Sequence, residues 1–166
     1  MHSGEAVYIQ ATAQNLEQVL KASMALPWVY RDFPLVDGTA MTDGGVADGI
    51  PVAEAIRLGA TRIMVVRSRW QGYVRKDTAW HRLARWRLKD HGRLVRTMRQ
   101  RVARFDAAIQ LMRDPPRGVR IHQVCPPREF ASGRFSQSPK NLHHGYRLGR
   151  AVAADAIRHW HDHASD

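Results

Sequence analysis

The sequence has a single cysteine, Cys125, so no disulfide can form within the chain. That suits a reducing compartment. No apolar run approaches the ~18 residues that a membrane-spanning helix needs, and the N-terminus lacks the basic-then-apolar order of a secretory signal peptide. With 166 residues, of which 44% are hydrophobic, the chain fits one globular domain. We therefore expect a cytoplasmic protein, with peripheral contact to a membrane as an open alternative.

Acidic residues are scarce in one segment of the chain. Between Arg67 and Arg104 there are thirteen Lys or Arg residues and only two acidic ones, Asp77 and Asp90. The rest of the sequence is balanced, so the net charge of +11 belongs to this segment. Such a segment attracts phosphate groups on anionic lipid or on nucleic acid.

Three interpretations of the basic segment stay open. It could be a solvated helix surface, a contact with an anionic membrane, or a nucleic-acid interface. For a membrane contact the candidate side chains are Arg82, Arg85, Arg93 and Arg96. Nucleic acid has the least support, because the sequence contains neither zinc-finger spacing nor an RNP-type aromatic motif.

Hydrophobic periodicity and cap signals predict the helices. We expect them over residues 15–24, 50–58, two within 78–112 that are separated near Gly92, and one that starts at Ser138. In the last helix five residues are predicted to form the buried face: Leu142, Tyr146, Ala153, Ile157 and Trp160.

Strands are expected between these helices. They are predicted at residues 7–9, 63–66 and 119–124, with a hairpin over 34–41 that turns at Asp37-Gly38. Because residues 63–66 are all apolar, they should form a strand covered on both faces, as in a parallel sheet. The alternation of helix and strand is typical of an α/β layered fold.

The most distinctive stretch runs from residue 39 to residue 66. A predicted strand is followed by Asp43-Gly44-Gly45, then by a helix with Pro51 near its start, then by Gly59-Ala60 and a second apolar strand. This order resembles the catalytic-aspartate block of patatin-like phospholipases. The preceding residues 22–27, Ala-Ser-Met-Ala-Leu-Pro, are similar to the Ala-Ser-x-Ala-x-Pro element of that family. The basic helices and residues 120–160 resemble its bacterial subgroup.

This resemblance implies a fold and an activity. The fold would be a three-layer α/β patatin-like domain, with residues 1–70 carrying the catalytic aspartate and 71–166 adding the basic helical pair, a strand and a final helix. The activity would be hydrolysis of carboxylic esters in lipids by a Ser-Asp dyad, without metal or organic cofactor. Asp43 would be the base of the dyad, and Gly44 and Gly45 would let the serine-bearing turn approach.

The sequence departs from the family in one respect. None of its seven serines lies in Gly-x-Ser-x-Gly, and it has no glycine-rich oxyanion loop before Asp43. We therefore expect the chain to start partway through such a domain and to be inactive alone. A parallel sheet interrupted in this way exposes an apolar edge, which predicts self-association or a partner chain that completes the sheet.

Other residues have simpler interpretations. Asp48 competes for the carboxylate role but more plausibly caps the next helix. Ser23 lacks a glycine elbow, so it is a poor substitute nucleophile. His159 and His163 have helical metal-ligand spacing, but we expect them to be solvated residues at a helix end and predict no metal site. The alternative to an enzyme is a non-catalytic module that binds anionic lipid or nucleic acid through its basic helices.

Overall fold

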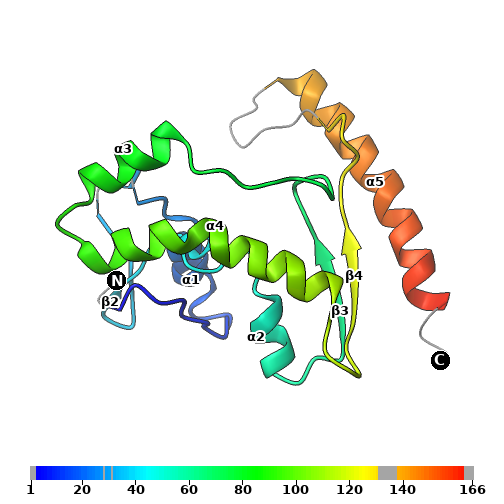
Figure 1. The fold of residues 1–166 in the computed structure, drawn as a ribbon, viewed down its shortest axis with the longest axis horizontal. Helices are drawn as coiled ribbons and strands as arrows, with labels where there is room; N and C mark the ends of the chain where they lie inside the picture. Colours follow the sequence, from blue (N-terminus) through cyan, green and yellow to red (C-terminus); the bar gives the residue numbers. More distant parts are fainter. Residues whose placement is uncertain (1–2, 28, 31, 131–137, 163–166) are drawn as a thin grey trace. The chain divides into compact units, whose positions relative to one another are not determined.

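The computed structural model describes residues 3–27, 29–30, 32–130 and 138–162, without the side chains of Trp80 and Asp162. Its helices and strands follow one another along the chain as Figure 1 shows. Their bounds are α1 Leu16–Met24, β1 Leu35–Val36, β2 Thr39–Ala40, the 3-10 turn η1 Gly44–Val46, α2 Val52–Arg57, β3 Arg62–Val66, α3 Ala79–Arg87, α4 Gly92–Arg113, β4 Arg120–Val124 and α5 Pro139–Asp162.

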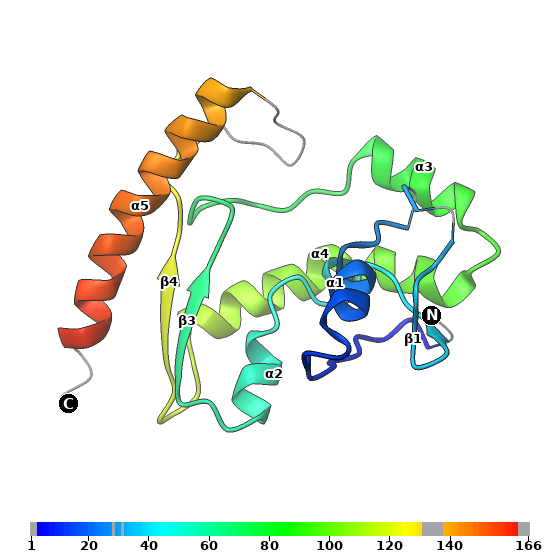
Figure 2. The ribbon, with the colours of Figure 1, turned by 180° about the vertical axis from the view of Figure 1, so that it is seen from behind.

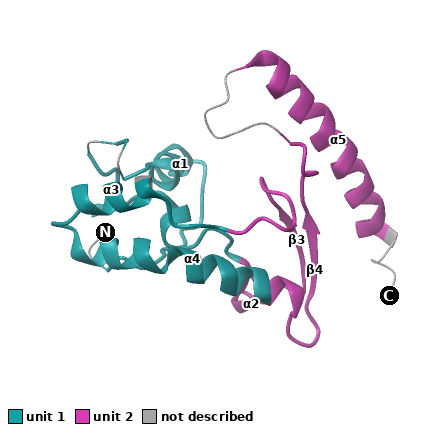
Figure 3. Cartoon of the chain, turned by 45° about the horizontal axis from the view of Figure 1, so that its top comes forward, with its two compact units in different colours: residues 1–51, 75–110 teal, residues 52–74, 111–166 magenta. Residues whose placement is uncertain are grey.

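The chain divides into two units that interleave along the sequence (Figure 3). Unit 1 contains residues 1–51 and 75–110, and unit 2 contains residues 52–74 and 111–166. The candidate aspartate and the basic helices therefore belong to unit 1, whereas the parallel strands belong to unit 2. The division at residue 70 that the sequence suggested does not coincide with a boundary of either unit. That residues 1–166 form a single domain stays a prediction.

The predicted hairpin of unit 1 is confirmed. β1 and β2 pair antiparallel, with Leu35 opposite Ala40 and Val36 opposite Thr39. Asp37 and Gly38, between the strands, have φ values of 48° and 72°. Positive φ at both central residues defines the two-residue turn that Asp-Gly favours. Val36 is almost completely buried, so this small hairpin is anchored in the core of its unit.

The predicted pair of basic helices is also confirmed, with a short connection over residues 88–91. The helical pair contributes apolar side chains to one buried cluster, made of Val46, Ala84, Leu88, Leu94 and Met98. Val46 comes from η1, directly after Asp43, so the helical pair and the candidate aspartate loop share the same core. Burial of such side chains supplies about 1.5–3 kcal/mol each.

In unit 2, β3 and β4 form a two-stranded parallel sheet, as expected from the apolar run at residues 63–66. The register places Arg62 opposite Arg120 and Val66 opposite Val124. α2 contacts β3, and α5 contacts β4; α5 runs beside β4 in both ribbon views (Figures 1 and 2). Val124, Met112 and Ala156 are buried within this unit.

Two predictions about burial in unit 2 are wrong. β3 is not covered on both faces: its middle residues are half-buried, and Val66 is 75% exposed. Pairing with β4 covers an edge of β3 and not its faces, and the contact with α2 is too small to cover the whole strand. The predicted buried face of α5 is also wrong, since Leu142, Tyr146 and Ile157 are all at least about half exposed. α5 instead buries Gly145 and Ala156, whose small size allows close approach to its neighbours.

The strand predicted at residues 7–9 is not formed. Tyr8 is held instead by its side chain, because its hydroxyl donates to the Asp48 carboxylate at 2.6 Å. The fold class is thus mixed α/β, and the described residues form one small parallel and one small antiparallel sheet. Within the described residues, no helix has the length and apolar character needed to cross a membrane.

Candidate functional site

Asp43 caps the start of η1 and lies three residues after β2 ends at Ala40. Its backbone amide donates to the Ala25 carbonyl at 2.9 Å, so the loop is fixed to the end of α1. Its carboxylate oxygen Oδ1 accepts the Gly45 amide at 2.7 Å, as capping aspartates do. The second oxygen, Oδ2, has no hydrogen-bond partner among the described residues.

The loop around Asp43 depends on its glycines. A Cβ at Gly45 would lie 3.0 Å from Asp43 Oδ1, and one at Gly44 would lie 3.9 Å from Ser23 Oγ. Gly45 therefore allows the short Asp43 contact, while Gly44 leaves open space in front of the loop. That Gly44 and Gly45 let a serine-bearing turn approach Asp43 stays a prediction.

A hollow of about 260 Å³ lies beside Asp43. One wall comes from residues 3–7 and another from Leu94 and Thr97 of α4. Gly4 permits this arrangement because its φ is +72°, and a Cβ there would lie 2.8 Å from the Arg93 carbonyl oxygen. Thr97, which is buried, donates its hydroxyl to the Gly4 carbonyl. Asp43 is thus in a recess open to a reacting group, not enclosed in the core.

Asp48 and Ser23 line a different hollow, of about 300 Å³, on the other side of Gly44. Both Asp48 oxygens are engaged: Oδ1 accepts the Ile50 amide at 3.2 Å and Oδ2 accepts the Tyr8 hydroxyl. Asp48 therefore supports the entry to α2, near the expected capping role. Ser23 is exposed, and it does not line the hollow beside Asp43.

The basic helices enclose a groove of about 620 Å³. Five cationic side chains line it together with Trp86: Arg82, Arg85, Lys89, Arg96 and Arg99. Three of them were expected from the sequence. Arg93 was also expected but does not line the groove, while Lys89 and Arg99 were missed. Helical spacing could have found both, because Lys89 follows Arg85 by four residues and Arg99 follows Arg96 by three.

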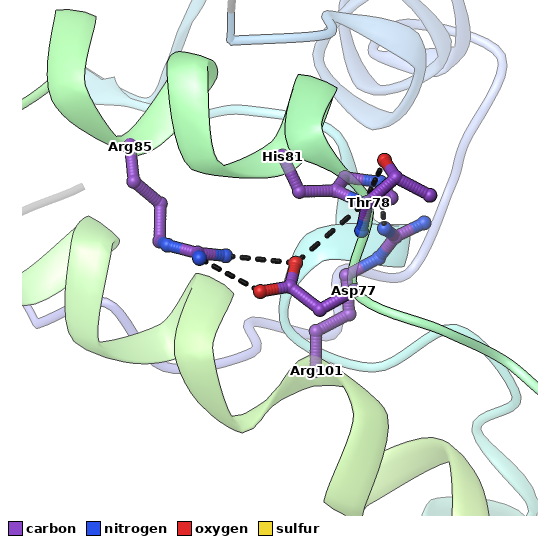
Figure 4. A network of polar contacts seen from close by, with 5 residues as sticks. All are labelled: Asp77, Thr78, His81, Arg85 and Arg101. Atoms are coloured by element: carbon purple, nitrogen blue, oxygen red, sulfur yellow. Dashed lines mark hydrogen bonds and ion pairs between the residues drawn. The ribbon is translucent and has the colours of Figure 1, made fainter.

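Only one groove cation forms an ion pair with a described carboxylate. Arg85 makes two bonds to Asp77, at 2.9 and 2.7 Å (Figure 4), and its side chain is 15% exposed. The hydrogen-bonded Arg85 guanidinium holds the pKa of the Asp77 carboxyl below its usual range, and the Asp77 carboxylate in turn raises the pKa of Arg85. Arg82, Lys89, Arg96 and Arg99 form no ion pair within the described part of the chain.

This charge pattern opposes stability. Cations three or four residues apart on a helix repel one another, at roughly 0.2–0.5 kcal/mol per pair. Arg93 also lies in the first turn of α4, where the helix dipole disfavours positive charge. No acidic residue occurs in the first turn of α3 or α4. Local choices that oppose the fold are expected where a surface serves function.

His81 links the two basic helices (Figure 4). Its Nε2 lies 2.7 Å from Nη1 of Arg101 on α4, and its Nδ1 lies 2.9 Å from the Thr78 hydroxyl. The Thr78 backbone amide donates to Nδ1 at 3.1 Å, as in a capping box. A guanidinium can only donate, so both ring nitrogens face a donor, which disfavours the doubly protonated ring. Burial, and then the charge of Arg101, lower the pKa of His81, against a smaller opposing effect of Asp77.

The histidines near the C-terminus do not form a metal site within the described residues, where no group of three or more His, Cys, Asp or Glu residues is placed to hold an ion. His159 stacks against His122, with ring centroids 6.5 Å apart. His163, which has metal-ligand spacing to His159 in the sequence, lies outside the described residues.

Comparison with known proteins gives two matches. Residues 91–164 match the model of a domain of unknown function, DUF6363. The chain is 32% identical over 145 residues to the uncharacterized protein YjjU of Escherichia coli strain K12, a match that covers 86% of this chain and 40% of the relative. The chain therefore spans less than half the length of that relative. No solved structure matches it.

Proposed function

We propose that this chain supplies the aspartate of a patatin-like Ser-Asp acyl hydrolase, with lipid carboxylic esters as substrates. The observation that supports this best is the state of Asp43. One carboxylate oxygen is fixed by the Gly45 amide, the other has no partner among the described residues, and Asp43 lines an open hollow. A general base needs a lone pair that is held in place and not already occupied.

In the proposed reaction the serine hydroxyl attacks the ester carbonyl and its proton passes to Asp43 Oδ2. The C–O bond to the alcohol then breaks, the alcohol leaves with a proton, and water later releases the acyl group from the serine. Backbone amides would stabilise the oxyanion of each tetrahedral intermediate. Both the serine and these amides would come from outside the 166 residues, and the space at Gly44 would admit them.

The three-layer patatin-like fold belongs to the same proposal. Its support is the order of elements around Asp43 and the two-stranded parallel sheet of unit 2. Val66, 75% exposed on β3, supports the prediction that a partner chain, a further segment or a second copy of this chain completes the sheet. A cytoplasmic location and the absence of cofactors stay predictions.

The experiment uses the E. coli relative as host. In a chimera, this chain replaces the matched 145-residue segment of YjjU, and hydrolysis of a chromogenic fatty-acyl ester and labelling by a fluorophosphonate are measured. We expect both activities in the chimera and neither in the 166-residue chain alone. Asp43→Asn, which keeps size and the bond to Gly45, should lower the rate about 10²–10⁴-fold, the usual contribution of a general base.

Two matched controls remove a carboxylate nearby. Asp37→Asn is an exposed turn substitution that suits the positive φ, because asparagine tolerates that conformation. Asp48→Asn tests the competing carboxylate in the other hollow. Both should keep most of the activity. Full activity in Asp43→Asn, or fluorophosphonate labelling of Ser23 in the isolated chain, would show that the proposed assignment is wrong.

A further inference from the structure

We propose that the groove between α3 and α4 is a binding site for the phosphate groups of an anionic lipid surface. The groove is defined by its lining, which combines Arg82, Arg85, Lys89, Arg96 and Arg99 with Trp86 and Val95. This binding does not depend on the acyl hydrolase activity proposed for Asp43, and the groove shares no lining residue with the hollow beside Asp43.

Charge makes the groove selective for anions. Arg85 is occupied by Asp77, and this pair fixes one wall of the groove. The other four cations are exposed and form no ion pair within the described residues. Three of them are arginines, whose planar guanidinium can donate two parallel bonds to a phosphate. A ligand with several phosphates close together would relieve the repulsion between these four cations.

Apolar side chains beside the groove favour a membrane over nucleic acid. Trp86 is 67% exposed within the groove lining, and Leu83, one turn earlier on α3, is 46% exposed. Tryptophan and leucine flanked by arginines are typical of helices that lie in the headgroup region of a bilayer. A nucleic-acid surface would use aromatic stacking, to which Leu83 contributes nothing.

The test is co-sedimentation of the 166-residue chain with two kinds of vesicle. One contains phosphatidylcholine alone, and the other contains phosphatidylcholine and phosphatidylglycerol in a ratio of about two to one. We expect binding only to the second, weakening when salt is raised from about 0.1 M to about 1 M, because salt screens exposed charges. Each groove cation removed should lower the partition coefficient about fivefold.

The groove variant carries Arg82→Gln, Lys89→Gln, Arg96→Gln and Arg99→Gln. Its control removes the same charges elsewhere, through Arg113→Gln, Arg117→Gln, Lys140→Gln and Arg147→Gln, at positions that are all exposed. We expect a loss of at least about 100-fold for the groove variant and less than about tenfold for the control. Equal losses in the two would overturn the proposal, because they would indicate diffuse attraction without a site.

Two further measurements distinguish a lipid surface from nucleic acid and from a small phosphate ligand. Leu83→Ala should weaken vesicle binding several-fold. The second measurement is binding of a mixed-sequence single-stranded oligonucleotide. The lipid assignment would be overturned if the oligonucleotide bound more tightly than the vesicles, and if that binding were unaffected by Leu83→Ala and lost in the groove variant. Full competition by millimolar inorganic phosphate would overturn it in favour of a small phosphate ligand. Circular dichroism should show that the groove variant melts no lower than the wild type. If it melts early, the single variants Arg82→Gln and Arg99→Gln, each about fivefold weaker, provide the same test.

Discussion

The packing of the N-terminal segment against α4 predicts different costs for alanine at two glycines with the same backbone conformation. Gly4 and Gly38 both have φ of +72°. At Gly38 a Cβ would meet nothing within 4 Å, so Gly38→Ala carries only the backbone penalty of that conformation. This penalty is about 1–2 kcal/mol for a residue with a Cβ.

At Gly4 the same penalty is joined by a steric one. A Cβ there would lie 2.8 Å from the Arg93 carbonyl oxygen and 2.9 Å from Thr97 Oγ1. Neither neighbour can move easily, because the first is helix backbone and the second donates its hydroxyl to the Gly4 carbonyl. Overpacking of this kind costs about 1–3 kcal/mol, so Gly4→Ala should cost about 2–5 kcal/mol in total.

The assay is urea denaturation of the wild type and both variants, followed by far-ultraviolet circular dichroism and tryptophan fluorescence. The difference between the variants isolates the steric cost, since the backbone penalty cancels. Equal destabilisation of Gly4→Ala and Gly38→Ala would refute the reasoning. It would mean that residues 3–7 are not packed on α4 and do not form a wall of the hollow beside Asp43.

Two further predictions concern the helical pair. In the folded chain, burial and the charge of Arg101 lower the pKa of His81. In the unfolded chain, His81 takes up its proton near the ordinary histidine pKa of about 6.5. The free energy of unfolding should therefore fall as the pH drops below that value. His81→Gln, which suits the capping position after Thr78, should flatten this dependence in thermal melts between about pH 7.5 and 5, and an unchanged profile would contradict the role of His81. Met98→Ala, at a core residue 6% exposed, should lower the unfolding free energy by about 2–5 kcal/mol. Leu83→Ala on the exposed side should cost under about 1 kcal/mol in the same urea titration, and similar costs for the two would argue against the described core.

Local signals in the sequence were sufficient for much of the fold. The Asp37-Gly38 turn was predictable because few residue pairs adopt positive φ at both positions. The break near Gly92 was predictable because glycine and the polar residues around it interrupt a clear helical period. The parallel pairing of β3 was predictable from a short run of apolar residues. The turn and the break depend on interactions between near neighbours in the chain, whereas β3 finds its partner β4 far along the sequence.

The candidate sites were predictable in part. The Asp43-Gly44-Gly45 group and the basic segment are visible as residue patterns. Among the described residues one oxygen of Asp43 has no partner, whereas both oxygens of Asp48 are engaged. This difference depends on contacts with Gly45, Ile50 and Tyr8. The sequence likewise could not tell that Asp77 occupies Arg85 among the basic residues.

The errors have a common physical origin. Periodicity gives the angle between side chains on a helix, but it does not say which stripe meets the rest of the protein. On α5 the large apolar stripe with Leu142 and Tyr146 is exposed, and the small residues Gly145 and Ala156 are buried. In the same way, composition gave β3 its apolar character, while its covering depends on neighbours far away in the chain. The sequence by itself thus determined most of the segments that form helices, strands and turns, although not residues 7–9, because these follow largely from local sterics and hydrogen bonding. Only the tertiary structure decided which apolar faces are covered and which charges remain unpaired, because both depend on contacts between distant segments.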